Sequence, residues 1–200
     1  MSEFQKKIVD EALAAGATGA RFFDPRRLVV EERLAGYCRE PRCPNHGLSP
    51  SCPPHVQGPA AMRQWRDAAE HGLAITIDAP IDVLHSSQRF EIMFLLHEIV
   101  AAAERQAIAA GYSGARGFAG GSCKKTFCDD YPECARLAGQ TCRNPQSARP
   151  SMSGFGVDVA AMMEVAGWPK TTVDEAVEQG ASMSWVAGLV LLCRYKATKI

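Results

Sequence analysis

The sequence predicts an α/β or α+β domain in which a single sheet is packed with helices and two long cysteine-rich loops carry metal sites. Three observations support this fold. Helical and strand-like hydrophobic patterns alternate along the chain, no tight-hairpin motif joins two strands, and a continuous apolar run of strand length covers 185–192. The length of 200 residues suits one domain over 1–200 with a substantial hydrophobic core.

The helices are predicted from hydrophobic spacing and from residues that begin or end a helix. Ser2 and Gln5 have the spacing of a capping box and begin a helix expected over 3–15. The strongest helical pattern covers 90–110, where polar residues form only a narrow face, so we expect this helix to be mostly buried. Further helices are predicted over 59–72, 157–166 and 172–180.

The strands are predicted from short apolar runs that turn residues or helices bound. The segments are 17–23, 73–78, 112–119 and 185–192. The last of them, Trp-Val-Ala-Gly-Leu-Val-Leu-Leu, has no polar residue, which is typical of a buried central strand.

Two segments are too rich in proline and glycine for regular structure. The segment from Cys38 to Pro59 contains six prolines, which exclude both a helix and a central strand there. The segment from Gly120 to Gly156 is again rich in Gly, Pro and Ser. Loops of this length inside a compact domain need something to order them, and a bound metal would do so.

Charge and targeting patterns restrict the classes of function. The chain has 22 basic and 22 acidic side chains, which argues against a general binder of nucleic acid or of anionic membranes. No apolar run is long enough to span a bilayer, and the N-terminus lacks the apolar core of a secretory signal. We therefore expect a cytoplasmic protein. The sequence leaves its oligomeric state open, and it has no nucleotide-binding glycine motif.

Seven of the eight cysteines fall into two groups. The first group is Cys38, Cys43 and Cys52, and the second is Cys123, Cys128, Cys134 and Cys142. In a reducing compartment, clustered thiols hold metals or carry out redox chemistry more often than they form disulfides. We therefore predict that these seven cysteines are metal ligands.

The spacing of the thiols favours iron–sulfur clusters over zinc. Neither group has the paired Cys-x2-Cys knuckles that are usual in structural zinc sites. Irregular spacing suits a loop that wraps a larger inorganic group, and the Cys-Pro steps at Cys43 and Cys52 recur among cluster ligands. We predict two clusters, of the [4Fe–4S] type, with zinc as the alternative.

The first group has only three cysteines, so its fourth ligand is open. The candidates are His46, His55 and Cys193, or a position left free for water or substrate. A free position would let the metal act as a Lewis acid, with His46 or His55 as a general acid or base. Cys193 ends an apolar strand, where a free cysteine more often fills the core.

Basic side chains flank the second group of cysteines. A cluster held by four thiolates is anionic, so neighbouring cations would stabilise it and raise its reduction potential. We therefore predict that Lys124, Arg143 and Arg149 contact the cofactor. The alternative is that these side chains only solvate the loop.

The motifs around the cysteines also resemble those of a known family. They are 51–54 (Ser-Cys-Pro-Pro), 120–125 (Gly-Gly-Ser-Cys-Lys-Lys), 142–145 (Cys-Arg-Asn-Pro) and 148–159 (Ala-Arg-Pro-Ser-Met-Ser-Gly-Phe-Gly-Val-Asp-Val). They are similar to those of small cysteine-rich bacterial and archaeal proteins, described as predicted metal-binding proteins of unknown function. The resemblance covers roughly 17–192 and implies metal binding at the seven cysteines, without implying a particular reaction.

The hypothesis that these patterns favour is low-potential electron transfer to a redox partner protein or to a bound small-molecule substrate. A first alternative is a non-redox enzyme in which an open iron of the three-cysteine site acts on a small thiol or hydroxyl compound. A second is a structural or metal-delivery module that binds zinc.

Overall fold

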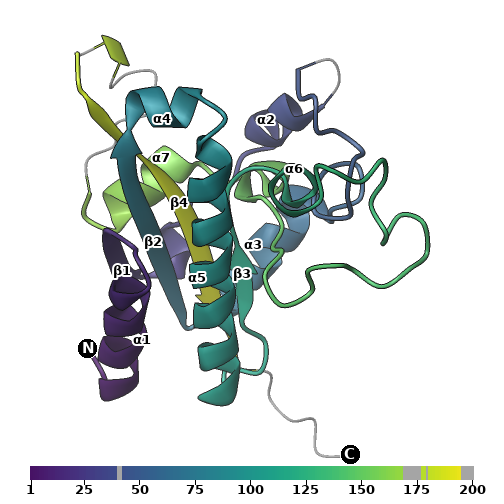
Figure 1. The fold of residues 1–200 in the computed structure, drawn as a ribbon. Coiled ribbons are helices and arrows are strands. Elements are labelled where there is room, and N and C mark those ends of the chain that lie inside the picture. Colours follow the sequence, from purple (N-terminus) through teal and green to yellow (C-terminus); the bar gives the residue numbers. More distant parts are fainter. Residues whose placement is uncertain (40–41, 169–176, 179, 195–200) are drawn as a thin grey trace, which may run out of the picture.

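A four-stranded antiparallel sheet lies at the centre of the computed structural model, which describes residues 1–39, 42–168, 177–178 and 180–194. Across the sheet the strands follow the order β1-β2-β4-β3 (Figure 1). Their bounds are β1 (Gly19–Phe23), β2 (His71–Pro80), β3 (Arg116–Phe118) and β4 (Met183–Leu192). The mixed helix and strand class predicted from the sequence is confirmed.

Helices cover both faces of this sheet (Figure 1). On one face lie α1 (Glu3–Ala14) and α5 (Arg89–Ala109), and on the other lie α3 (Gly58–Ala68) and α7 (Val159–Val165). The connections contain shorter elements: η1 (Pro25–Arg27), α2 (Glu32–Ala35), η2 (Gly36–Cys38), α4 (Ile81–His85), α6 (Cys123–Phe127) and η3 (Met152–Phe155).

The central strand β4 is apolar at consecutive positions because both of its faces are buried. Val190 and Leu192 pack into the core on the α1 and α5 face, while Leu189 and Leu191 pack into the core on the α3 and α7 face. A strand that is covered on both faces has no solvent side, so its positions from 186 to 192 are all apolar. β4 pairs antiparallel with both β2 and β3, which confirms the predicted buried central strand.

The predicted elements that fall on described residues are found, with shifted ends. Gln5 N donates to Ser2 Oγ at 3.2 Å and Ser2 N to Gln5 Oε1 at 2.8 Å, so the capping box of α1 forms. The helix expected over 59–72 is shorter, because α3 ends at Ala68 and β2 has already begun at His71. The helix predicted over 172–180 lies mostly outside the described residues.

Gly72 belongs to strand β2 instead of ending a helix. A Cβ atom at this position would lie 2.6 Å from the ring of Phe23, which comes from the neighbouring strand β1. The glycine is therefore needed because an aromatic ring crosses the strand there. The local sequence does not reveal this reason for the glycine, because Phe23 comes close to it only in the folded chain.

The long helix α5 has 21 residues, seven of them buried, and lies against β4 and β3. Among the described residues, no helix combines the length and the apolarity that crossing a membrane requires. Both cysteine loops lie beside β3 and the N-terminal half of α5, around α6 (Figure 1). They touch directly, since Ser151 N donates to Ser51 O at 3.4 Å.

Candidate metal centres

The first cysteine group lines one cavity. Cys38, Cys43 and Cys52 border a space of about 140 Å³, together with residues of the second loop and of η3. Cys52 is buried, while Cys38 and Cys43 are half-buried. Three thiols that lie 14 residues apart or fewer in the sequence are thus brought to one place, which is what their clustering predicts.

Turns fix the shape of this first loop. Cys43 N donates to Arg39 O at 3.2 Å, and Cys52 N donates to Ser49 O at 3.1 Å. A longer closure joins Gly47 N to Pro53 O at 2.8 Å. These hydrogen bonds satisfy part of the loop's backbone from within the loop, where no helix or strand supplies partners.

Gly154 explains part of the motif at 148–159. It lines the first cavity, and a Cβ atom there would lie only 2.9 Å from Pro53 Cδ. Without a side chain, η3 can approach the cysteine loop closely and form the cavity wall. The motif therefore supplies a close-packed support for the first cysteine group.

Of the three candidate residues for a fourth ligand of the first site, only His46 lines its cavity. His46 lines the same cavity as the three cysteines. His55 is exposed and is not among the residues that line it. Cys193 is buried just past the end of β4, where its carbonyl accepts a hydrogen bond from Gly114 N. In the sheet, Arg116 of β3 pairs with Leu191 and Phe118 pairs with Leu189. Cys193 therefore lies beside the start of β3, whereas the second cysteine loop follows the end of β3.

The second cysteine group lines a separate and smaller cavity. Cys123, Cys128, Cys134 and Cys142 all border it, and its volume is about 20 Å³. That is roughly the space of one water molecule, so a larger group needs the cysteine side chains to rotate outward. Among the described residues, no three His, Cys, Asp or Glu side chains are grouped closely enough to hold a single metal ion.

Asn144 contacts two sulfur atoms of the second group. Its side-chain Nδ2 donates to Cys128 Sγ at 3.4 Å, and its backbone N donates to Cys142 Sγ at 3.4 Å. Hydrogen bonds of this kind stabilise the thiolate form that binds metals. Sequence reasoning missed this residue, although its place two positions after Cys142 is a usable signal.

Of the three predicted cofactor-contacting cations, two line the second cavity. Lys124 is 7% exposed, and its Nζ donates to the carbonyl oxygens of Cys128 and Tyr131, each at 2.7 Å. The guanidinium of Arg143 lies 3.9 Å from the centre of the Tyr131 ring. A positive charge is therefore held inside this loop by hydrogen bonds to its backbone.

The third cation, Arg149, lies outside both cavities. Its Nε donates to Glu104 Oε2 at 2.5 Å, and both side chains are largely buried. The other carboxylate oxygen, Oε1, accepts a hydrogen bond from Gly117 N at 2.7 Å. Through Glu104, Arg149 therefore links the end of the second loop to α5 and β3.

His97 supports both ends of the second loop from α5. It is fully buried, its Nε2 lies 3.2 Å from Gly120 O, and its Nδ1 accepts a hydrogen bond from Arg149 N at 3.1 Å. Burial is the main cause that lowers the pKa of His97 to about 4. The neutral ring with a proton on Nε2 satisfies both contacts. The sequence offered no signal for this role beyond a histidine on an apolar helix.

The two cysteine groups meet at Ser122. The Cys52 thiol lies 3.7 Å from Ser122 Oγ, and Ser122 is followed directly by Cys123 of the other group. Burial raises the pKa of the Cys123 thiol, against a smaller lowering by its hydrogen bond with the Ser51 hydroxyl. The serine before each of these cysteines thus contacts the cysteine of the other group: Ser122 contacts Cys52, and Ser51 contacts Cys123. No sequence pattern predicted these contacts.

Burial also raises the pKa of the Cys38 thiol, to about 11, with a further contribution from Cys43 and Cys52. A thiol in this position carries a proton at neutral pH, and a metal that binds to it must displace that proton.

An α/β scaffold that carries two cavities walled by cysteine thiols has the donor set of a metal-binding protein. The chain belongs to the DUF2284 family of predicted metal-binding proteins, whose model matches residues 21–192. The match spans both cysteine groups and nearly the whole sheet. It confirms the family resemblance inferred from the motifs. Comparison with curated proteins and with solved structures found no match.

Proposed function

We propose that this protein holds two iron–sulfur clusters and transfers electrons at low potential to a partner protein or to a bound substrate. The observation that carries the proposal is the separation of the thiols into two sets, each lining its own cavity. Clusters of iron and sulfide are held by cysteine thiolates in this way, and they supply one-electron chemistry when bound.

The size of the first cavity supports a cluster in place of one ion. A zinc ion needs four ligands at about 2.3 Å from sulfur, whereas Cys38, Cys43 and Cys52 surround a space of about 140 Å³. In the second site, Lys124 and Asn144 place a positive charge and hydrogen-bond donors beside the four thiols. Both features favour an anionic group with several sulfur atoms.

The contact between the two sites supports electron transfer as their use. Cys52 of one site contacts Ser122, the residue bonded to Cys123 of the other. Two redox groups held by these cysteines would be near neighbours, which suits the passage of electrons from one to the other. The chain itself would hold the two groups at a fixed distance and orientation.

The test is purification of the full chain without oxygen, followed by iron and sulfide analysis and electron paramagnetic resonance. We expect two clusters in the native protein. Cys52→Ser and Cys142→Ser should each lose one site and keep about half of the iron, because the sites are separate. Cys193→Ala, which removes the buried cysteine away from both cavities, is the matched control and should keep all of it. A colourless protein with stoichiometric zinc would contradict the proposal and favour the zinc module.

A second candidate is a non-redox enzyme whose three-cysteine site binds substrate at an open metal position. It is favoured by the presence of only three cysteines, together with His46, in the first cavity. His46 would then move a proton or complete the ligand set. A ligand-induced change in the signal of one unique iron supports this candidate, and four protein ligands on every cluster exclude it.

A further inference from the structure

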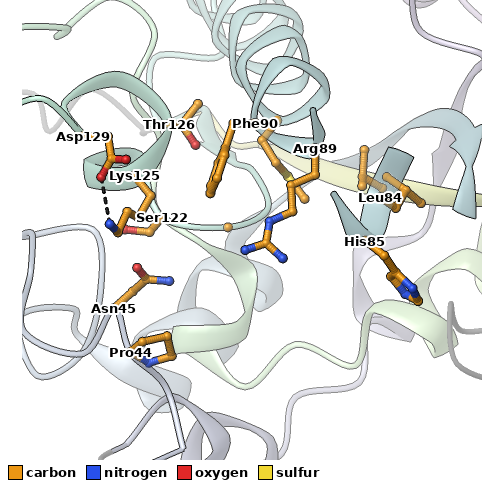
Figure 2. A pocket seen from close by; sticks show the side chains of 13 residues that line it. Pro44, Asn45, Leu84, His85, Arg89, Phe90, Ser122, Lys125, Thr126 and Asp129 are labelled. Carbon is orange, nitrogen blue, oxygen red and sulfur yellow. Dashed lines mark hydrogen bonds and ion pairs between the residues drawn. The ribbon is translucent and has the colours of Figure 1, made fainter. Parts of the chain in front are cut away.

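A pocket of about 600 Å³ lies next to the three-cysteine site, between the start of α5, α6 and the first cysteine loop (Figure 2). This volume is within the range of small-molecule sites. The pocket shares three wall residues with the three-cysteine cavity, namely Asn45, Gly121 and Ser122. A molecule bound there would therefore lie beside the first metal site.

Two polar atoms in the pocket wall have no hydrogen-bond partner among the described residues. They are Asn45 Oδ1 and Thr126 Oγ1, and both atoms are buried. A buried polar atom without a partner costs free energy, and such atoms are few in native proteins. Asn45 Oδ1 can only accept a hydrogen bond. Because this atom is covered in the structure, a ligand hydroxyl reaches it once the Asn45 side chain turns toward the pocket.

The charge of the pocket comes from Arg89. Figure 2 shows its guanidinium extending from the start of α5 towards the side occupied by Asn45 and Lys125. Lys125 is already bonded to Asp129 at 2.8 Å, and this bond lowers the pKa of the Asp129 carboxyl. In the part of the chain that the structure describes, no carboxylate pairs with Arg89.

The guanidinium of Arg89 lies 5.0 Å from the centre of the Phe90 ring and has no carboxylate partner among the described residues. It suits a carboxylate, because its planar fork can donate two parallel hydrogen bonds. Arg89 is also the first residue of the 21-residue helix α5, whose dipole favours negative charge at this end. Apart from the imidazole of His85, the remaining side chains of the wall are apolar and accommodate a hydrocarbon body; they are Pro44, Leu84, Phe90, Met93 and Val186.

We propose that this pocket binds a small organic acid that carries a hydroxyl group. The carboxylate binds Arg89, the hydroxyl donates to Asn45 Oδ1, and the body packs against the apolar wall. The hydroxyl then lies at the wall shared with the three-cysteine cavity. The role of this acid as substrate rests on the function proposed above, whereas its binding does not.

The probe is mandelate, a hydroxy acid with an apolar ring, added to the full chain purified without oxygen. Binding is measured by calorimetry against three comparison compounds. Mandelamide keeps the shape without the charge, phenylacetate lacks the hydroxyl, and inorganic phosphate tests for a general anion site. We expect mandelate to bind about tenfold or more tightly than each of the three.

Arg89→Gln should weaken mandelate binding at least about tenfold, and Arg89→Lys should weaken it less, because charge remains without the fork. Asn45→Ala should remove the preference for mandelate over phenylacetate. Arg26→Gln, an exposed arginine outside the pocket, is the control and should bind normally. Iron and sulfide content is measured in each preparation.

Unchanged binding in Arg89→Gln overturns the proposal, as does phosphate that binds as tightly as mandelate. Failure of the proposed function is distinct, because it shows as absent iron and sulfide while mandelate still binds. With clusters present, mandelate should also shift the resonance signal of the site that Cys52→Ser removes. A shift confined to the other site contradicts the placement of the hydroxyl.

Discussion

Ser122 Oγ lies 3.7 Å from Cys52 Sγ, although the two residues are 70 positions apart in the sequence. Ser122 is 4% exposed, so this contact is shielded from water. Because Ser122 precedes Cys123, this buried residue connects the two cysteine groups, as the contact of Ser51 with Cys123 also does. Changes at this position should therefore reveal which properties of the two sites depend on each other.

With the proposed cluster bound, Ser122→Ala should make the reduction potential of the first site more negative. When Cys52 is a thiolate, the serine hydroxyl donates to its sulfur and withdraws electron density, which favours the reduced state. The measurement is a redox titration followed by electron paramagnetic resonance. Ser153→Ala is the matched control, since Ser153 lines the same cavity but has no described hydrogen bond to sulfur. An equal shift in both variants would rule out this explanation.

With the proposed cluster bound, Lys124→Met should make the reduction potential of the second site more negative, because it removes a buried positive charge from the loop that would hold the cluster. The first site should change less. Lys124→Arg keeps the charge and should restore most of the potential. Lys125→Met serves as the control, since Lys125 is more exposed and pairs with Asp129. If Lys125→Met shifts the second potential as much as Lys124→Met, the buried charge is not the cause.

The buried His97 should make stability depend on pH between about 6.5 and about 4. Its pKa is lowered to about 4 in the folded protein, whereas the unfolded chain titrates near 6.5. In this range the unfolded state binds more protons, so the free energy of unfolding falls as pH falls, by up to about 3 kcal/mol.

Urea unfolding of metal-free protein, followed by tryptophan fluorescence, measures this dependence without a contribution from acid loss of metal. His97→Gln should be less stable than the native protein at pH 7, because the contacts to Gly120 and Arg149 change. It should also lose less stability than the native protein on acidification. The same pH dependence in both proteins would show that another group is responsible.

Glu104→Ala should lower the free energy of unfolding by about 3 kcal/mol or more, because it leaves the largely buried Arg149 without its partner. It also removes the acceptor of Gly117 N. Glu91→Ala, an exposed position on the same helix, should cost much less. Denaturant unfolding compares the two. Similar losses would mean that the ion pair contributes little beyond helix propensity.

Much of the fold could be predicted because local patterns determine it. The capping box at Ser2, the long helix at 90–110 and the apolar strand at 185–192 each depend on residues close in sequence. The helix is less buried than its sequence predicts, because only seven of its 21 residues are buried. Gly72 could not be interpreted in this way, because the ring of Phe23 that requires it comes from another strand.

In the candidate sites, too, features that depend on neighbouring residues could be predicted and those that depend on the folded chain could not. Clustering in the sequence was enough to group the seven cysteines, since neighbours along a loop end up in one cavity. The contacts of Ser122 and His97 depend on segments that meet only in the folded chain, so no spacing could predict them. The ion pair of Arg149 with Glu104 has the same origin, and it leaves Arg149 outside the cavity where charge alone had suggested it.

The two hydrophobic clusters that sandwich the sheet contain no cysteine and, apart from the partly buried Val56, no residue of the first loop. Under the proposed function, assembly of the layered body would depend little on the loading of the first site, whereas the second loop contributes Met152 and Phe155 to the core. A chain that lost the inorganic group of its first site would then keep its layered architecture and could be refilled.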